Sequence, residues 1–231
     1  MSVATLCTYN IHAAIGTDGR LDPARTAAVI AETDSDIVAL QEVEHHAVGD
    51  DDLPAFLARS GGYRLYPGPT LLRYEHLYGN ALLSRLPVNG VRRIDLSVAR
   101  REPRGAIEIE IQNGHTRVRI VNAHLGLRPG ERREQVRRLL RHLETAPPAD
   151  VTVLTGDINE WLLWGRPVRW LNRHFARTPA PPSFPSAWPL LSLDRIWINP
   201  REHLLSLHAH LSETARHASD HLPVCARFRL S

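Results

Sequence analysis

Alternation between hydrophobic and polar positions predicts more strands than helices in this chain. In Ala106–Ile111, three isoleucines fall on one face of a strand and two glutamates on the other. Asn113-Gly114 follows at once and predicts a hairpin. In the last expected strand, we expect the apolar residues at even positions from Leu222 to Leu230 to share one face. The segments that alternation or short apolar runs predict as strands are 3–10, 36–41, 79–84, 106–111, 116–124, 151–155, 193–198 and 222–230.

Helical spacing appears in two main segments. Asp22 followed by Pro23 is typical of an N-cap and first helical position. Residues 129–143 carry an apolar stripe at helical spacing, and we expect the arginines of this segment to form its polar face, namely Arg132, Arg133, Arg137, Arg138 and Arg141. Hairpins mixed with helical connections favour an α/β fold in which two mixed sheets pack face to face with helices outside.

Length and composition favour one soluble domain over residues 1–231. The chain is 43% hydrophobic, and the Pro-rich stretch 178–182 is interpreted as a loop because no second core follows it. No apolar run approaches the roughly 20 residues that a bilayer span requires. The first residues lack the features of a signal peptide, so we expect a cytoplasmic protein. Cys7 and Cys225 are expected to be buried thiols and not a disulfide.

The charge pattern fits an anionic substrate. All 28 basic residues are arginine, the net charge is +3 and the isoelectric point is about 9.2. A GC-rich genome explains this usage, yet each guanidinium is still a planar fork suited to phosphate. The absence of lysine excludes Schiff-base chemistry. The mild basicity does not single out nucleic acid.

Polar residues with metal or acid–base chemistry recur at the ends of the expected strands. Each by itself is typical of a cap or turn. Together they predict a shared cleft at one edge of the sheets. These residues are Asn10, Gln41, Glu42, Asn122, His124, Asp157, Asn159, Asp194, Asp220 and His221.

Seven short motifs in a fixed order carry a family resemblance over almost the whole chain. They are Thr8–His12, Asp36–Val43, Gly79–Arg85, Asn122–Leu125, Thr155–Asn159, Leu193–Ile196 and Ser219–His221. In combination they resemble the endonuclease/exonuclease/phosphatase superfamily, the metal-dependent phosphoesterases that share a fold with deoxyribonuclease I. The resemblance implies a four-layer α/β sandwich with the active site at one edge of the two central sheets.

The resemblance also implies a metal site. Glu42 would be the principal ligand, with Asn10 and Asp220 beside it. Their hard oxygen donors suit Mg²⁺, with Mn²⁺ as an alternative. Several nucleases of the family carry an acidic residue where this chain has His12. Histidine is a softer ligand, so His12 is expected to contact phosphate, to support a ligand, or to be purely structural.

The remaining matched positions imply direct hydrolysis by an activated water. Asp157 and Asn159 would hold the water and the phosphate. His221 would be the general base or an electrostatic partner, with its tautomer fixed by Asp194. His124 would stabilise or protonate the phosphate side.

Three functions follow from the sequence, and one is favoured. Asn10–His12 with Gly16–Arg20, and the stretch from Ser183 to Ile196, look more like the small bacterial and sphingomyelinase-like members than the DNA-repair branch. We therefore favour a phospholipid or related small-molecule phosphodiester as substrate. A DNA or RNA nuclease is the alternative, indicated by arginine clusters at 92–93, 100–104 and 128–141 unless these are solvated faces. A binding module with a degenerate site is disfavoured because every expected position is filled.

The segment Trp161-Leu162-Leu163-Trp164 has two interpretations. Two tryptophans and two leucines beside the expected site, followed by Arg166 and Arg169, have the composition of a membrane contact. Apolar residues in a globular chain are more often core, and this second interpretation is the one we favour. No obligate protein partner is evident.

Overall fold

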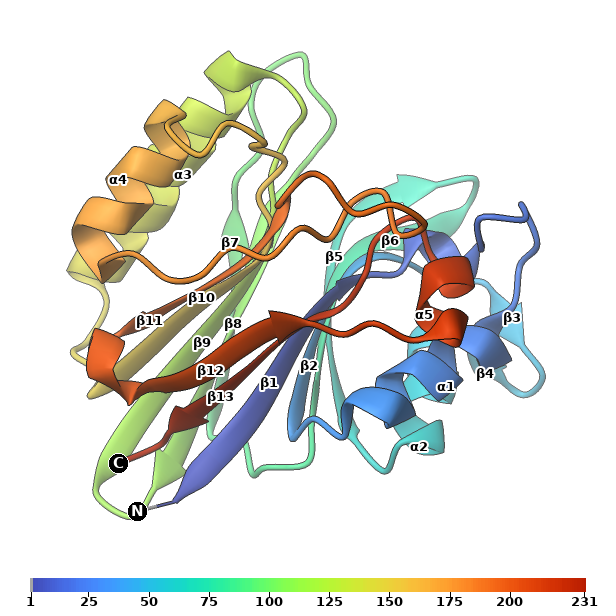
Figure 1. Cartoon of the computed structure of the whole chain (residues 1–231), viewed down its shortest axis with the longest axis horizontal. Coiled ribbons are helices and arrows are strands. Elements are labelled where there is room, and N and C mark those ends of the chain that lie inside the picture. The colour runs from blue at the N-terminus through green and yellow to red at the C-terminus, as the bar shows by residue number, and fades with distance from the viewer. Residues whose placement is uncertain (1) are drawn as a thin grey trace.

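The computed structural model describes residues 2–231. Two large mixed sheets pack face to face, with helices on both outer faces (Figure 1). The first sheet has the order β12 (Leu204–Ala209), β13 (Val224–Arg229), β1 (Val3–Asn10), β2 (Ile37–Glu44), β6 (His76–Ser84), β5 (Arg64–Arg73). The second has the order β11 (Asp194–Asn199), β10 (Val151–Asp157), β9 (Thr116–His124), β8 (Gly105–Asn113), β7 (Gly90–Asp95). This is the four-layer α/β sandwich that the sequence predicted.

The helices divide between the two outer faces. α1 (Pro23–Thr33), α2 (Leu53–Ser60) and α5 (Glu213–Ala218) lie on the side of the first sheet, and α3 (Pro129–Thr145) and α4 (Arg166–Phe175) cover the second (Figure 1). Short elements complete the chain: the 3₁₀ turns η1 (His12–Ala14) and η2 (Arg201–His203), and the pair β3 (Ala47–Val48) and β4 (Asp51–Asp52). Within residues 2–231, no helix is long and apolar enough to span a bilayer.

All eight strands expected from the sequence are present, but several other elements gave no clear signal. β5 contains Pro67, Gly68 and Pro69, which are typical of an edge strand and hide its pattern. β7 lies at the other sheet's edge and exposes Arg92 and Arg93, so its alternation is weak. The sequence prediction also lacked β12, α2 and α5, which are short.

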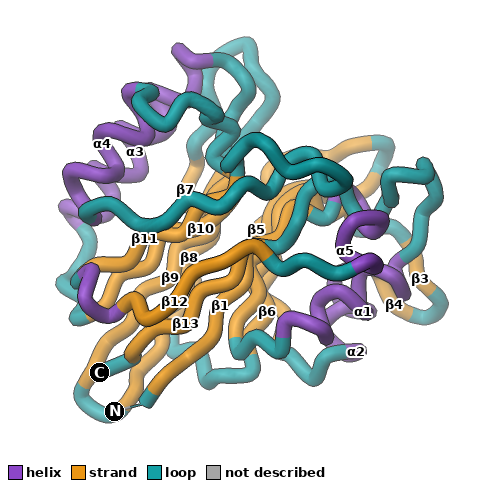
Figure 2. Tube along the Cα trace, in the orientation of Figure 1, coloured by secondary structure: helices purple, strands orange, loops and turns teal. Residues whose placement is uncertain are grey.

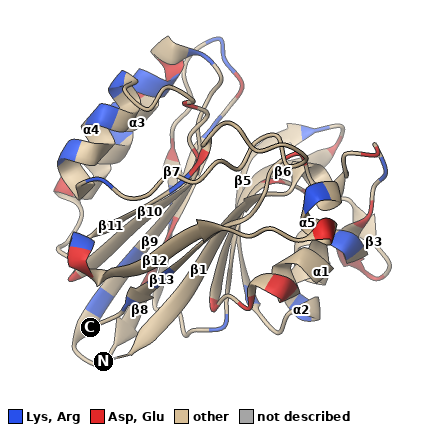
Figure 3. Cartoon of the chain, in the orientation of Figure 1, with Lys and Arg blue, Asp and Glu red and all other residues tan. Residues whose placement is uncertain are grey.

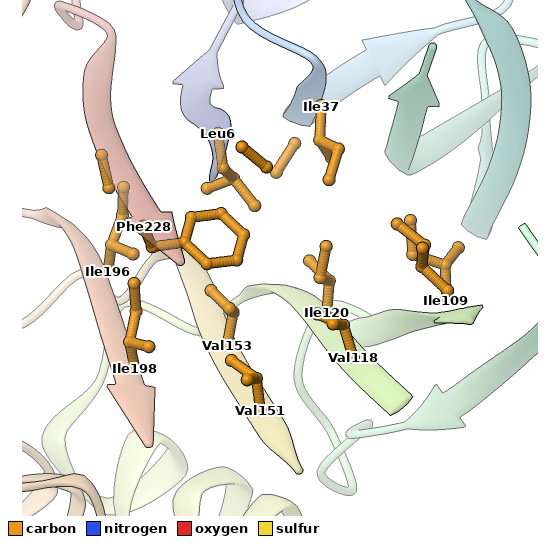
Figure 4. Close-up of a cluster of buried hydrophobic side chains, with 14 of the residues drawn as sticks. Leu6, Ile37, Ile109, Val118, Ile120, Val151, Val153, Ile196, Ile198 and Phe228 are labelled. Atoms are coloured by element: carbon orange, nitrogen blue, oxygen red, sulfur yellow. The ribbon is translucent and has the colours of Figure 1, made fainter. Parts of the chain in front are cut away.

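The central core lies between the two sheets (Figure 4). Ile109 and its alternate neighbours point into this core, as predicted, together with Leu6, Val153 and Phe228. The prediction that Leu222 shares the apolar face of the last strand is wrong. Leu222 precedes β13 and packs in the separate cluster between the first sheet and its helices, so it does not share the face of the later even positions.

The outer face of the second sheet is more polar than an ordinary core. Glu108 points away from the isoleucines, as predicted, but α3 covers it, and its carboxylate lies 3.3 Å from Arg119 and 2.8 Å from His142. The prediction that Arg132 belongs to the polar face of α3 is wrong, because Arg132 is buried and pairs with Glu160 at 3.1 Å. Position 132 lies four residues before Val136 and therefore belongs to the packing stripe.

The loops that follow the strands gather at one end of the sandwich, while both termini lie at the opposite end (Figure 2). Cys7 and Cys225 are free, buried thiols that face each other in the register of β1 and β13.

Candidate active site

Strand direction brings the polar strand ends together. β1 runs parallel to β2, and β9 runs parallel to β10, so Asn10, His124 and Asp157 stand at carboxyl ends of their sheets. β11 and β13 are antiparallel to these strands and therefore deliver Asp194 and His221 to the same edge from their amino-terminal sides. The topology thus collects residues that lie far apart in sequence into one cleft.

Below the cleft, Gln41 and Asn122 tie the two sheets together. The amide nitrogen of Gln41 donates to Asn122 Oδ1 at 2.7 Å, and the Asn122 amide donates to the carbonyl of Leu40 at 2.8 Å. Both side chains are fully buried. These two strand-end residues therefore fix the distance between the sheets on which the site above them depends.

Glu42 owes its position to a bulge in β2. The pairing of β2 with β6 shifts register between Leu40 and Val43, and Glu42 adopts a positive φ of 56°. Such a bulge redirects a side chain, and strain of this kind is typical of functional sites. The Asn10 amide nitrogen donates to Glu42 Oε1 and to Asp157 Oδ2, each at 3.1 Å. Asn10 therefore holds a carboxylate of each sheet in place.

Asp194 and His221 form a buried pair. Asp194 Oδ2 lies 2.8 Å from His221 Nδ1 and also accepts from the Ser183 hydroxyl at 2.5 Å. Nε2 of His221 is directed towards Asp157 Oδ2, 3.8 Å away. Burial disfavours the charged imidazole, but Asp194, Asp157 and Asp220 outweigh burial and raise the pKa of His221 to about 10. Asp194 thus holds the ring in one orientation and favours its protonated form.

This raised pKa predicts how the stability of the chelator-treated protein depends on pH. The stabilisation from charged His221 is fully present below the unfolded pKa of 6.5 and is lost as pH rises towards about 10. The melting temperature in chelator is expected to fall across this window, and to fall less steeply in His221→Gln. Parallel pH profiles for the wild type and the variant would show that the pair does not stabilise the fold.

Asp157, Asn159 and His124 form the opposite side of the site. Burial raises the pKa of Asp157 to about 6, against the opposing effect of His221. Asp157 Oδ1 accepts the backbone N–H of Asn159 at 2.9 Å, and the Asn159 amide donates to the Leu125 carbonyl at 2.9 Å. Asn159 has a positive φ of 53°, and its amide lies 3.1 Å from His124 Nε2. Together these contacts direct a carboxylate, an amide and an imidazole at one point.

Arg104 is a site residue that the sequence did not single out. Its guanidinium donates to His124 Nδ1 at 2.9 Å and pairs with Glu102 at 2.9 Å. Burial lowers the pKa of His124, and the neighbouring charge of Arg104 lowers it further. The only signal in the sequence was the arginine cluster at 100–104, and for Arg104 the solvated-face interpretation is wrong because its side chain is mostly buried.

Asp220 and His12 lie towards the surface. Asp220 lines the cleft, and His12 Nδ1 stands 4.0 Å from Asp220 Oδ1. His12 begins η1 with a positive φ of 46°, while its backbone N–H donates to Asn10 Oδ1 at 3.1 Å. His12 does not line the cleft. It contacts the side chains of Asn10 and Asp220.

The cleft has a volume of about 430 Å³ and two unlike walls. Arg73 and Arg104 make one wall basic, and the Arg73 guanidinium sits 4.8 Å above the ring of Tyr78. The other wall is apolar and consists of Leu127, Trp161, Phe184, Leu191 and Leu193. These lining residues come from loops and strand edges, where periodicity carries no signal.

The expectation that residues 161–164 pack into the core is wrong. Trp161 is 49% exposed and Trp164 is 70% exposed, and the two leucines between them are also exposed. The loop turns outward because the Leu162 N–H donates to the buried Glu160 carboxylate and the Gly165 N–H donates to the Leu162 carbonyl. Trp161 therefore forms a rim of the cleft.

Acidic and imidazole groups at the centre of the site lie close enough to gather a cation. Ligand atoms of Asp157, Asp194 and His221 all lie within 4.8 Å of one another. Glu42 adds a further carboxylate, since its Oε1 lies 3.9 Å from His124 Nε2 across the same cleft. The site thus has the donor chemistry of a metal-assisted phosphoesterase.

The fold and this site are those of a phosphoesterase, and comparison with known proteins gives the family. The chain belongs to the Endonuclease/Exonuclease/phosphatase family, whose model matches residues 7–221. It is 32% identical to the protein YbhP of Escherichia coli (strain K12) over 213 residues, covering 85% of this chain and 84% of that protein.

Solved structures share the architecture. An endonuclease/exonuclease/phosphatase from Beutenbergia cavernae superposes with a TM-score of 0.81 at 25% identity, covering 100% of this chain and 72% of that one. TDP2 of D. rerio, complexed with a single-strand DNA product, superposes with a TM-score of 0.72 at 16% identity, covering 99% and 100% of the two chains. At the latter identity the likeness concerns the fold alone.

Proposed function

We propose that this protein hydrolyses a phosphodiester by direct attack of a water molecule, with Mg²⁺ or Mn²⁺ as cofactor. The observation that carries the proposal is the convergence of the Asp194–His221 pair and Glu42 on Asp157 in one cleft. No cysteine, serine or lysine nucleophile lines the described part of this cleft, which favours water over a covalent intermediate.

The donor set of the cleft fits a hard divalent cation. Glu42 and Asp220 offer carboxylate oxygens on the cleft side, and Asn10 Oδ1 is oriented by the backbone of His12. Asp194 is a poorer ligand, because its Oδ2 already accepts from Ser183 and pairs with His221. We therefore assign the cation to Glu42, Asn10 and Asp220. When bound, the cation would neutralise negative charge on the phosphate oxygens.

Protonation states suggest how the remaining residues divide the work. With a pKa near 6, Asp157 is ionised at neutral pH and can accept a proton from water. Asp194 favours the protonated form of His221, so His221 would act as an electrostatic partner that stabilises charge on the phosphate. Asn159 and His124 would contact the phosphate oxygens from the opposite side.

A phospholipid or related small-molecule phosphodiester is the substrate class that we propose. The apolar wall of the cleft continues into the exposed residues Trp161–Trp164, which suits an acyl or interfacial contact. Nucleic acid is the second candidate, supported by the basic wall of Arg73 and Arg104 and by the fold shared with TDP2. A peripheral membrane contact through Trp161 and Trp164 would distinguish a phospholipid substrate from nucleic acid.

The test compares substrates in the presence of Mg²⁺: phospholipid vesicles, a soluble chromogenic phosphodiester, and plasmid DNA. The double variant Trp161→Ala with Trp164→Ala is expected to lose vesicle binding and vesicle hydrolysis. It should retain most of its turnover of the soluble diester and most of its melting temperature, because Trp164 is exposed and Trp161 is half-exposed at the rim, where it covers the Arg132 guanidinium. Tyr74→Ala, an exposed aromatic residue that does not line the cleft, is the matched control. Faster cleavage of plasmid DNA than of either diester would instead favour the nuclease.

A further inference from the structure

A second cavity lies on the other side of the exposed 161–164 segment. It has a volume of about 360 Å³, and its polar lining comes from Arg169, Asn172, Arg177, Thr178 and Arg195. Trp161 lines the active-site cleft, whereas Leu163 and Trp164 line this cavity, so the segment separates the two. We refer to this cavity as the arginine pocket.

Arg195 is a buried guanidinium whose side chain has few partners. Its neighbour Asp194 points into the active site, and strand alternation sends Arg195 to the opposite face of β11, beneath α4. Arg195 is only 6% exposed, and its Nε donates to the Ser192 carbonyl at 2.9 Å. Within residues 2–231, neither terminal nitrogen donates a hydrogen bond, and because Nη2 is enclosed by protein atoms, Nη1 is the nitrogen that a ligand in the cavity could reach. Burying such a group without an acceptor is costly, so an additional acceptor would stabilise it.

The charge around Arg195 is not balanced locally. No aspartate or glutamate of the described chain lines the arginine pocket. Glu160 and Asp194 act on Arg195, yet burial prevails and lowers the pKa of Arg195 to about 10. The Glu160 carboxylate is already occupied, since it accepts from Arg132 and from the Leu162 N–H. Three guanidinium groups therefore surround the cavity without a carboxylate between them.

The neighbouring surface extends this positive character. An adjoining cavity shares Arg169, Asn172 and Arg177 and adds Arg173. Figure 3 shows basic residues along α3 and α4, the two helices on this face. Asn172 Oδ1 accepts the Trp197 indole N–H at 2.9 Å, which fixes the amide and leaves its Nδ2 group free to donate. Planar guanidinium forks and an amide donor are the groups that bind phosphate oxygens.

We infer that the arginine pocket is a second, non-catalytic binding site for the phosphate group of an ester, held by Arg169, Arg177 and Arg195. Among the described residues, the lining contains no histidine, aspartate or glutamate, so it lacks the groups for hydrolysis. The volume exceeds that of a phosphate ion and leaves room for the carrier of the phosphate. A soluble phosphate ester and a lipid headgroup share this chemistry. The site does not depend on the proposed reaction.

The test follows the Arg195 Nε–H signal by nuclear magnetic resonance during titration with glycerol 3-phosphate in chelator. The signal is assigned to Arg195 by its absence from the spectrum of the Arg195→Gln variant. A saturable shift is expected in the wild type and in Arg141→Gln, an exposed arginine of α3 that does not line the pocket. Arg177→Gln, also exposed, should bind about tenfold more weakly or worse, because it loses a charged hydrogen bond. Turnover of a soluble diester should be unchanged in Arg177→Gln, which separates this site from the catalytic one.

A second arm identifies the source of the phosphate. Sedimentation with phosphatidylglycerol vesicles that is reduced in Arg177→Gln, but not in Arg141→Gln, would assign the site to lipid headgroups. Binding of glycerol 3-phosphate without vesicle binding would assign it to soluble esters. Equal behaviour of the two variants, no shift at Arg195, or a preference for an oligothymidylate over both probes would overturn the inference.

Discussion

Chelation of divalent cations is expected to abolish phosphodiester turnover, and Mg²⁺ or Mn²⁺ is expected to restore it. The physical reason lies at the centre of the cleft, where Glu42, Asp157 and Asp220 bring carboxylates to the position that an anionic phosphate would occupy. Without a cation these charges repel the substrate. In our proposal, a cation held by Glu42, Asn10 and Asp220 would attract the phosphate and stabilise charge in the transition state.

Glu42→Gln tests this assignment at one residue. The change keeps shape and hydrogen bonding but removes the charge, and turnover is expected to fall by at least about 10³-fold, corresponding to the loss of several kcal/mol of transition-state stabilisation. The metal concentration for half-maximal activity should rise as well. Glu44→Gln, on the same strand but outside the cleft, serves as the control. Full activity in excess chelator would refute the metal mechanism.

The second large effect concerns the acid–base residues. Asp157→Ala and His221→Ala are each expected to lower turnover by at least about 10²-fold, the scale of a positioned acid–base group. Asp157 is the proton acceptor in our proposal, and His221 is the charged group 3.8 Å from it. His208→Ala, an exposed histidine on β12, should leave turnover unchanged.

A double-mutant cycle tests how Asp194 acts. Asp194 is fully buried, and its Oδ2 contacts His221 Nδ1 at 2.8 Å without lining the cleft, so its effect should pass through the histidine. Asp194→Asn is therefore expected to reduce turnover in the wild type but to add little in a His221→Ala background. Independent, multiplicative losses in the double variant would show that Asp194 supports activity in another way.

The sequence by itself determined eight of the strands, the two main helices and the family. Strands such as β8 and β9 are readable because a sheet buried on one face imposes a two-residue period, and the Asn113-Gly114 turn joins them. The motif order also located the polar strand ends, from Asn10 to His221. Local pattern suffices for these features because each depends on residues that are close in sequence.

Only the tertiary structure decided which polar residues face one another and which apolar residues stay outside. Arg132 and Arg104 look like surface arginines in the sequence. The packing of α3 buries Arg132, however, and Arg104 donates a hydrogen bond to His124 in the site. Trp164 looks like a core residue, but the turn anchored by Glu160 exposes it. Arg195 lies under α4 because alternation along β11 directs its neighbour Asp194 to His221 on the opposite face. For Arg132 and Arg104 the deciding contacts join segments distant in the chain, and no local periodicity records such a contact. The turn that exposes Trp164 is local, but the Glu160 carboxylate that anchors it is buried against Arg132 of α3.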